Sequence, residues 1–356
     1  MKRKWLAILI FIPLPILLVL MNFLIDPANI FHDSSADVAK ALLDGKAAYF
    51  GTANSNEREL KRVMIEGMPH RVDCVTIGPS LVFGIRSENA GSDSFYNLSV
   101  SGADLYDDLA TFGMLEAYDC EIDRAIICVD SYCFDRKLAN TFTRHEALMP
   151  YSDYMTSLIY NEEDEVPSAT AAASLATKIN QLFSITYFQA SFDYFKQYGM
   201  AERKSWGIAD ESYGEAYYCA DGSFVYPKGY SESCTEDAVI SAAREYDCDY
   251  YFTKGECPDD IYFEIFKKLV IYLQDKGVDV DFFLCPLSPA LWDICDFEAH
   301  PMLPELERMA REFANERGID VIGSYNPYEV GVTNADFYDA RHMKHESLCK
   351  ISEFAR

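Results

Sequence analysis

The chain has 356 residues, 49% of them hydrophobic and 14% aromatic, so it is long enough and apolar enough to bury a sizeable core. Its formal net charge of −26 at pH 7 argues against nucleic acid as a partner, because little here can neutralise phosphates. The same charge argues against tight adhesion to anionic lipid, except through a local basic patch.

The N-terminus predicts a membrane anchor. Residues 1–4 carry three cations and precede residues 5–25, an apolar stretch of 21 residues without a charge. At a rise of about 1.5 Å per residue this stretch is long enough to span a hydrocarbon core of roughly 30 Å. The basic flank predicts a cytoplasmic tail at 1–4 and an extracytoplasmic remainder. A cleaved signal peptide is the alternative, but no convincing A-x-A site follows the stretch. The anchor makes the lipid bilayer the first predicted partner.

Residues 26–70 are expected to form a juxtamembrane helical segment, with the clearest periodicity at 37–50. Five short apolar runs then predict buried parallel strands at 74–78, 96–100, 125–130, 280–286 and 319–325. Helical patterns precede several of these strands, at 103–118, 259–277 and 303–318. The alternation predicts an α/β domain over 71–356, built as a three-layer sandwich around a five-stranded parallel sheet.

An insertion at about 135–257 interrupts this alternation. It is helical over 174–198 and then rich in Gly, Tyr and Cys. Its aromatic side chains can stack on sugar rings, although such side chains more often pack a core. Cys219, Cys234, Cys248 and Cys257 lie in its polar part, which leaves one or two disulfides open.

Several residues with catalytic chemistry follow the predicted strands. The first strand ends in "GPSL", which places Ser80 just past the carboxyl edge of the sheet, where parallel α/β proteins build their sites. Gly102 follows the second strand, and its N–H together with that of Ser80 can form an oxyanion hole. Asp130 and Ser131 follow the third strand and Trp292 follows the fourth, so all three are candidates to line a substrate site. Each feature alone is also explained by a turn, an N-cap or packing.

Near the C-terminus, Asp339 and His342 stand three residues apart in "DARH". Alone, Asp339 reads as the N-cap of a short final helix with His342 on its surface. With Ser80 the pair gains a second interpretation, because a serine nucleophile needs a base and the base needs a carboxylate to fix its tautomer. The pair follows the fifth strand and Ser80 the first, so all three are expected at one edge of the sheet. His342 and His345 have no third ligand nearby, so we predict no metal and no other cofactor.

At this point the chain resembles the SGNH/GDSL hydrolase superfamily, in which a serine follows the first strand, a glycine the second, and an Asp-x-x-His pair closes the domain. "GPSL", Gly102 and "DARH" match these positions. The resemblance implies a flavodoxin-like sheet, with Ser80 as nucleophile, His342 as base and Asp339 as its orienter. The single anchor, the "IDP" after it and the "GPS" variant are most similar to the family's cell-surface branch. That branch includes the D-alanyl-transfer protein of teichoic acid modification and exopolysaccharide O-acetylation proteins.

Two departures from the family pattern shape the functional prediction. Pro79 stands where the family has an aspartate, and "VDSYCFD" lacks the third block's asparagine, an oxyanion donor, offering Asp130 and Ser131 instead. Loss of one such donor typically costs on the order of 10²–10³ in turnover, which favours specialised acyl transfer over hydrolysis of arbitrary esters.

We therefore predict a membrane-anchored extracytoplasmic serine esterase or O-acyltransferase that acts on a cell-envelope glycan or glycopolymer through acyl-Ser80. An integral-membrane acyltransferase is a candidate partner. One alternative is a non-catalytic surface module that binds a glycan or such a partner. A lipase-like esterase with an apolar pocket beside Ser80 is the other alternative.

Overall fold

The computed structural model describes residues 13–27, 30–51, 56–135, 148–162, 164, 166–167, 178–199, 206–210 and 212–351. Across these ranges, no helix is both long enough and apolar enough to cross a membrane. Helix α2 (Pro13–Ile25) covers the second part of the predicted anchor. The first part, residues 5–12, lies outside the described residues, and the anchor stays a prediction.

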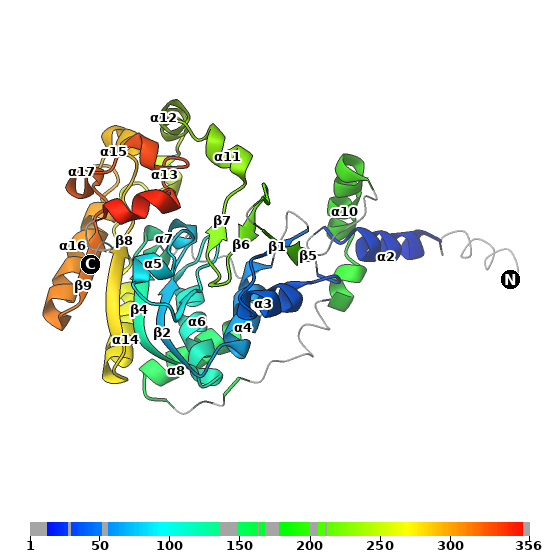
Figure 1. The fold of residues 1–356 in the computed structure, drawn as a ribbon, viewed down its shortest axis with the longest axis horizontal. Helices are drawn as coiled ribbons and strands as arrows, with labels where there is room; N and C mark the ends of the chain where they lie inside the picture. The colour runs from blue at the N-terminus through cyan, green and yellow to red at the C-terminus, as the bar shows by residue number, and fades with distance from the viewer. Residues whose placement is uncertain are drawn as a thin grey trace, which may run out of the picture.

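A five-stranded parallel sheet forms the centre of the molecule (Figure 1). Its spatial order is β3 (Phe95–Asn97), β2 (Arg71–Ile77), β4 (Glu121–Cys128), β8 (Asp279–Leu284) and β9 (Asp320–Gly323). All five predicted strands and the mixed α/β class are confirmed. The first strand of this sheet lies between the second and third, which is the flavodoxin-like order. Successive strands are therefore added on opposite sides of β2, and the switch point lies between β2 and β4.

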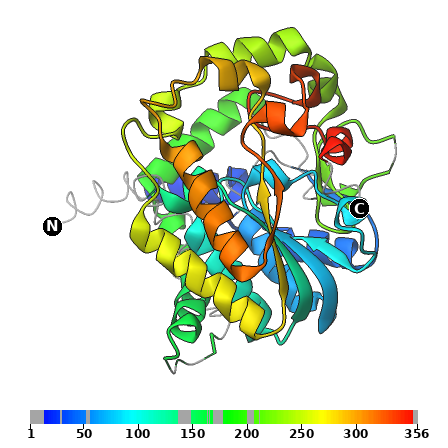
Figure 2. The ribbon, with the colours of Figure 1, turned by 90° about the vertical axis from the view of Figure 1, so that its left-hand side faces the viewer.

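Side chains alternate between the two faces of this sheet, so both faces are buried. On β4, Ile127 joins one apolar cluster and Ile126 joins the other. The first face is covered by three long helices, and Figure 2 shows the last two side by side: α6 (Leu105–Ala117), α14 (Asp260–Asp275) and α16 (Met302–Arg317). The second face is covered by short elements: η1 (Ser80–Val82), α5 (Ser87–Ala90) and η4 (His345–Lys350). The layer of long helices on the first face is therefore thicker than the layer of short elements on the second.

A second, antiparallel sheet was not predicted. Its order is β5 (Trp206–Ile208), β1 (Ala48–Phe50), β6 (Tyr217–Tyr218) and β7 (Phe224–Val225). The helical prediction for 37–50 fits α3 (Ser35–Leu43) but is wrong at its end, where β1 begins. Pairing with the insertion overrides local helix propensity there, since Phe50 packs edge-on against Tyr218 with ring centroids 6.0 Å apart. The juxtamembrane segment, which also contains α4 (Glu57–Gly67), thus shares a core with the insertion.

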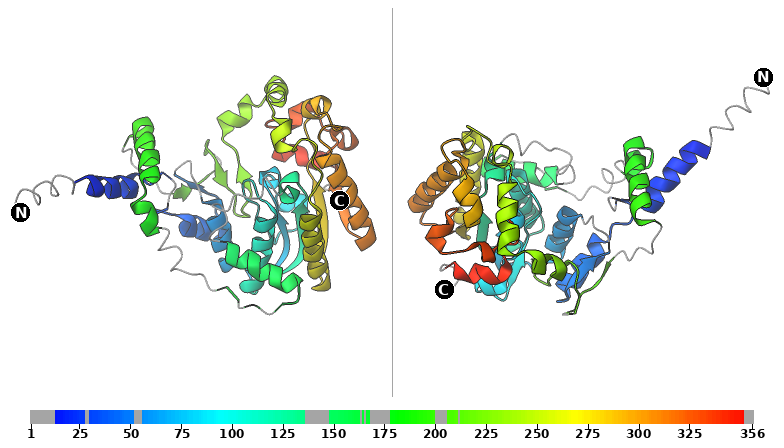
Figure 3. Two further views of the ribbon diagram at one scale, coloured as in Figure 1. Left: turned by 180° about the vertical axis from the view of Figure 1, so that it is seen from behind. Right: turned by 90° about the horizontal axis from the view of Figure 1, so that it is seen from above.

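The rest of the insertion divides into three parts. Helix α8 (Met149–Ile159) packs against α6 and belongs to the main helical layer. Helix α10 (Ile185–Tyr198) crosses α2, which itself runs across the strand direction of the central sheet (Figures 1 and 3). Beyond the second sheet, three helices pass over the carboxyl edge of the central sheet: α11 (Lys228–Ser233), α12 (Glu236–Arg244) and α13 (Cys248–Tyr251).

Short elements complete the carboxyl edge: α7 (Ser131–Phe134), α15 (Pro289–Ile294), α17 (Pro327–Val330) and η3 (Asn334–Asp336). All eleven cysteines lie in described residues and are free thiols. The disulfides that the sequence left open at Cys219, Cys234, Cys248 and Cys257 are therefore absent from the structure.

Candidate active site

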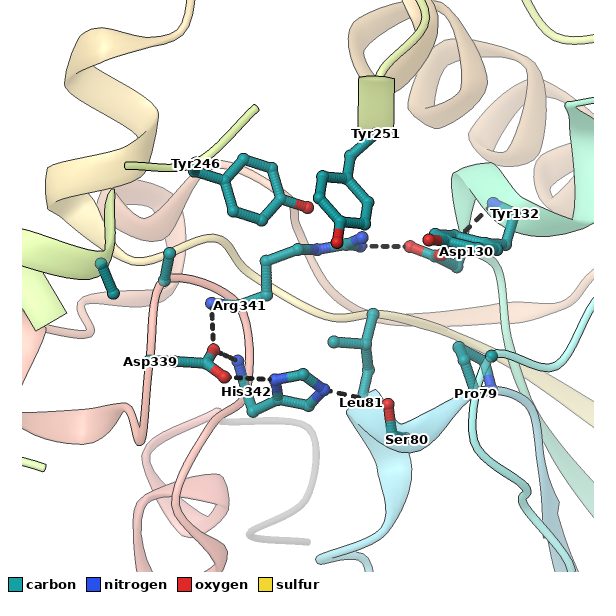
Figure 4. Close-up of a pocket in the computed structure, with 13 residues that line it drawn as sticks. Pro79, Ser80, Leu81, Asp130, Tyr132, Tyr246, Tyr251, Asp339, Arg341 and His342 are labelled. Atoms are coloured by element: carbon teal, nitrogen blue, oxygen red, sulfur yellow. Dashed lines mark hydrogen bonds and ion pairs between the residues drawn. The ribbon is translucent and has the colours of Figure 1, made fainter. Parts of the chain in front are cut away.

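Three side chains predicted to act together form one hydrogen-bonded chain (Figure 4). The Ser80 Oγ lies 2.9 Å from the His342 Nε2, across 262 positions of sequence. The other ring nitrogen, Nδ1, lies 2.8 Å from the Asp339 Oδ2. This is the order of contacts by which a histidine removes a serine proton while a carboxylate fixes its tautomer.

The turn after β2 presents Ser80. Gly78 has a φ of +138°, which L side chains rarely adopt, and a Cβ there would stand 2.5 Å from the Cys128 Cβ on β4. Glycine therefore lets the end of β2 pass close to its neighbouring strand. Pro79 follows, and Ser80 opens the 3-10 turn η1, where the Phe83 N–H donates to the Ser80 carbonyl over 3.2 Å. The serine is fixed by backbone geometry at the β2–β4 switch point.

The Asp339–His342 segment is a tight loop and not the N-cap of a final helix. A bridge between Phe337 and Met343 closes the loop, and the Tyr338 N–H donates to the His342 carbonyl over 2.8 Å. The Asp339 Oδ1 accepts the backbone N–H groups of both Arg341 and His342, each over 2.8 Å.

Burial raises the pKa of Asp339, but the hydrogen bond and charge of His342 and these two N–H groups lower it by more, to about 2. Asp339 is therefore a carboxylate at any pH near neutrality.

Gly102 lies beside the same cavity as Ser80. Its φ of +57° places it in a left-handed turn, and α6 begins three residues later at Leu105 with Asp104 as the N-cap. The helix predicted from residue 103 therefore begins two residues later, because the Asp104 carboxylate caps that end. In the described residues, no carbonyl of a turn or loop accepts a backbone hydrogen bond from the N–H of Ser80 or of Gly102. Both N–H groups are therefore available to a ligand.

A cavity of about 410 Å³ joins these groups. Its lining comes from the turns after β2, β3 and β4, from α12 and α13, and from the C-terminal loop: Pro79, Ser80, Leu81, Gly102, Asp130, Tyr132, Ala242, Tyr246, Tyr251, Asp339, Ala340, Arg341 and His342. This volume is large enough to hold one small organic group and part of another.

Asp130 lies in the cavity wall, but its carboxylate is engaged by Arg341, a residue that sequence reasoning missed. The Asp130 Oδ2 accepts a hydrogen bond from an Arg341 terminal nitrogen, and the two residues are 1% and 7% exposed. Burial lowers the pKa of Arg341 but the Asp130 carboxylate raises it by more, so the guanidinium stays charged. The Arg341 Nε is buried and has no hydrogen-bond partner. The only signal in the sequence was the position of Arg341 inside "DARH", between two residues already assigned.

The insertion supplies the aromatic wall of the cavity. Tyr246 and Tyr251 stack with ring centroids 4.7 Å apart, and Tyr132 lies 6.4 Å from Tyr251. The Tyr246 hydroxyl is buried and unbonded, close to the Arg341 guanidinium (Figure 4). All three tyrosines are half-buried, so their rings face the cavity without being sealed from solvent.

Two of the candidate lining residues do not reach the cavity. Ser131 is fully buried in the first turn of α7 with its hydroxyl unbonded. Trp292 turns away and packs against Phe297, with ring centroids 4.4 Å apart. Apolar contact explains the position of Trp292, because α15 buries Leu291 in the core of the first sheet face and Trp292 packs against the edge of that core.

Among the described residues, no group of three or more His, Cys, Asp or Glu side chains is arranged to hold a metal ion. Comparison with known proteins adds no name to this geometry, since no family model and no curated protein matches the sequence. The SGNH/GDSL resemblance therefore stays a hypothesis carried by the quoted motifs.

Proposed function

We propose that the protein is a membrane-anchored, extracytoplasmic serine enzyme of SGNH type, which transfers or removes O-acyl groups on a cell-envelope glycan or glycopolymer. The observation that carries the proposal is the Ser80–His342–Asp339 chain at the switch point of a flavodoxin-like sheet. Such a chain activates a hydroxyl that is otherwise a poor nucleophile.

In the first half-reaction, the Ser80 Oγ attacks the carbonyl carbon of an acyl ester while the His342 Nε2 takes the serine proton. Negative charge develops on the carbonyl oxygen, which the N–H groups of Ser80 and Gly102 stabilise. The carbon–oxygen bond to the leaving alkoxide then breaks, and His342 returns the proton to that oxygen. The products are a free alcohol and acyl-Ser80.

In the second half-reaction, a hydroxyl of the acceptor attacks acyl-Ser80, with His342 again removing the proton and then returning it to the Ser80 Oγ. A glycan hydroxyl gives O-acyl transfer and water gives hydrolysis. Asp339 holds the tautomer of His342 and offsets the charge of the imidazolium in both directions. Its pKa of about 2 keeps it ionised throughout.

The Arg341 Nε–H offers a charged donor where the family's third block has an asparagine. This Nε is buried without a hydrogen-bond partner in a residue that lines the cavity, while one terminal nitrogen of the same guanidinium is held by Asp130. We infer that this group stabilises the oxyanion or orients the acyl carbonyl. Charge-assisted hydrogen bonds are roughly twice as strong as neutral ones, so one such donor compensates for the absent amide.

The cavity wall supports a glycan as the substrate. Rings of Tyr132, Tyr246 and Tyr251 offer flat apolar faces with hydroxyl edges, which suit a pyranose with its apolar faces and equatorial hydroxyls. A lipase-like esterase would need a purely apolar pocket beside Ser80, and the tyrosine hydroxyls in this wall make that alternative less favoured.

The test uses the full chain in detergent with a fluorophosphonate probe, which reacts only with an activated serine. Labelling is expected in the wild type and lost in both Ser80→Ala and His342→Ala. Ser131→Ala is the matched control, because Ser131 follows β4 as Ser80 follows β2 yet lies outside the cavity. Intact mass after incubation with an activated acetyl ester then reports acyl-Ser80 directly.

A folded wild type that neither labels nor forms an acyl-enzyme contradicts the proposal. The non-catalytic surface module then becomes the better reading, with the same aromatic cavity as a glycan-binding site.

A further inference from the structure

We propose that α10 is a membrane-contacting helix, which lies on the bilayer surface beside the point where α2 leaves the bilayer. This inference rests on the proposed anchor and not on the proposed catalysis. Two stripes of side chains run along this one helix, of which only the second is apolar throughout. Tyr187 and Ser191 are buried toward α2, whereas Ile185, Phe188 and Phe192 share a different face.

The second stripe of α10 is open to solvent. Ile185 is 67% exposed and Phe192 is 43% exposed, and Phe195 continues the same face at 37%. Just before the helix, Phe183 adds a ring that is 63% exposed. Large apolar side chains gathered in this way mark a surface that another apolar phase covers.

Polar contacts fix α10 onto the end of α2. The Asn22 side chain, fully buried, donates to the carbonyls of Gln181, Leu182 and Ser184, each at 3.0 Å. The Tyr187 hydroxyl donates to the buried Asp26 carboxylate over 2.6 Å. These bonds join segments about 160 positions apart. They hold α10 at the end of α2 and fix the direction in which the stripe of α10 faces.

Continuity with α2 identifies the occupant as a lipid bilayer. The exposed side chains of α2 are all apolar, among them Leu14, Leu17 and Leu20, and they belong to the uncharged stretch 5–25. At about 100° per residue they spread over roughly half the helix circumference, which is wider than the seam of one partner helix. Helix α10 packs against this same helix, and its stripe stays exposed.

The charged groups of α10 fit the edge of a bilayer. Asp193 and Ala190 lie on the other exposed side of the helix, about 100° and 160° around its axis from Phe192. The Lys196 ammonium lies 4.4 Å from the Phe192 ring centroid and 3.3 Å from the Asp193 carboxylate, so a charged pair borders the stripe where the headgroups of a bilayer would lie. Because α10 crosses α2 in Figures 1 and 3, α10 lies along the membrane surface when α2 enters it.

The experiment measures tryptophan quenching by brominated lipid, with the full chain in phosphatidylcholine vesicles. Trp206 and Trp292 are replaced by Phe, which leaves Trp5 as the native reporter of the anchor. In that background, Trp5→Phe is combined with either Phe192→Trp on the stripe or Ala190→Trp on the other exposed side of the same helix. Circular dichroism melting checks that each variant is folded, and Ile185→Trp serves as a second stripe position.

Tryptophan at 192 or 185 is expected to lose most of its fluorescence with bromine near the headgroup end of the acyl chains, and less with bromine near the bilayer centre. Tryptophan at 190 is expected to keep its fluorescence. Unquenched tryptophan at both 192 and 185 overturns the proposal, whether water or a second copy covers the stripe. Quenching at 190 equal to that at 192 also overturns it, because the helix is then immersed. If Trp5 itself is unquenched, the anchor has failed, which is a separate result.

Discussion

Replacement of Arg341 by Met is expected to destabilise the protein strongly, because the Asp130 carboxylate would be left buried without its counter-ion. Asp130 is 1% exposed, and its carboxylate also accepts a hydrogen bond from the Tyr132 N–H over 3.3 Å. One such bond does not replace a guanidinium. Removing one partner of a buried ion pair costs about 3–5 kcal/mol, and this site falls in that range.

The loss of stability in Arg341→Met comes from the buried charge of Asp130 and not from the lost contact. A second substitution that removes this charge should therefore recover most of the lost stability. Asp130→Asn keeps the side-chain oxygen that caps α7 and removes the charge. The double variant Arg341→Met with Asp130→Asn is expected to lie within about 1–2 kcal/mol of the wild type, since replacing both partners of a buried pair is often near neutral.

The assay is equilibrium urea unfolding of the full chain in detergent, followed by circular dichroism. An exposed pair gives the matched control, because Arg71 and Asp123 are also joined across neighbouring strands but are 67% and 48% exposed. Arg71→Met is expected to leave the unfolding free energy close to that of the wild type, because an exposed ion pair contributes little. If Arg341→Met costs no more than Arg71→Met, or if the two substitutions in the Asp130 pair simply add, the buried-charge argument is refuted.

Four further predictions concern single positions, each measured by urea unfolding. Burial raises the pKa of Asp108, whose Oδ1 has no partner, so Asp108→Asn should stabilise by at least ~1 kcal/mol, increasingly so above pH 3.8. Its neighbour Asp107 is paired with Arg58, so Asp107→Asn should destabilise the fold by about 2 kcal/mol. A change of the unfolding free energy in the same direction for both substitutions would contradict this prediction. Gly78→Ala should cost more than about 2 kcal/mol from its φ and the steric clash, and a neutral result would refute the close approach. The low pKa of Asp339 stabilises the fold above pH 3.8 and that contribution is lost as pH falls through about 2, so the deficit of Asp339→Asn should shrink over that window. The side chain is 35% exposed, which limits the change to ~1 kcal/mol.

The central sheet was predictable because its strands are buried on both faces and therefore read as continuous apolar runs. The place of Ser80 and of the Asp339–His342 pair followed from the same rule, since parallel strands end at one edge. No tertiary information was needed to bring them together.

The parts that were missed depend on contacts between distant segments. Strand β1 exists because it pairs with β5 and β6, more than 150 positions away, and its local sequence resembles a helix. The contact of Arg341 with Asp130 spans 211 positions. Trp292 was assigned to the cavity because it follows a strand, yet its ring finds Phe297 instead. Side-chain direction within a turn is set by packing, which spacing alone does not encode.

The crosswise direction of α2 has a consequence for how substrate would arrive. An anchor that continues along α2 would hold the central sheet with its strands running along the membrane, so that the edge bearing Ser80 faces sideways and not outward. Acyl donors and acceptors carried by the membrane would then meet the cavity by lateral diffusion. Their density per area of membrane, and not their concentration in the surrounding solution, would set the rate of encounter.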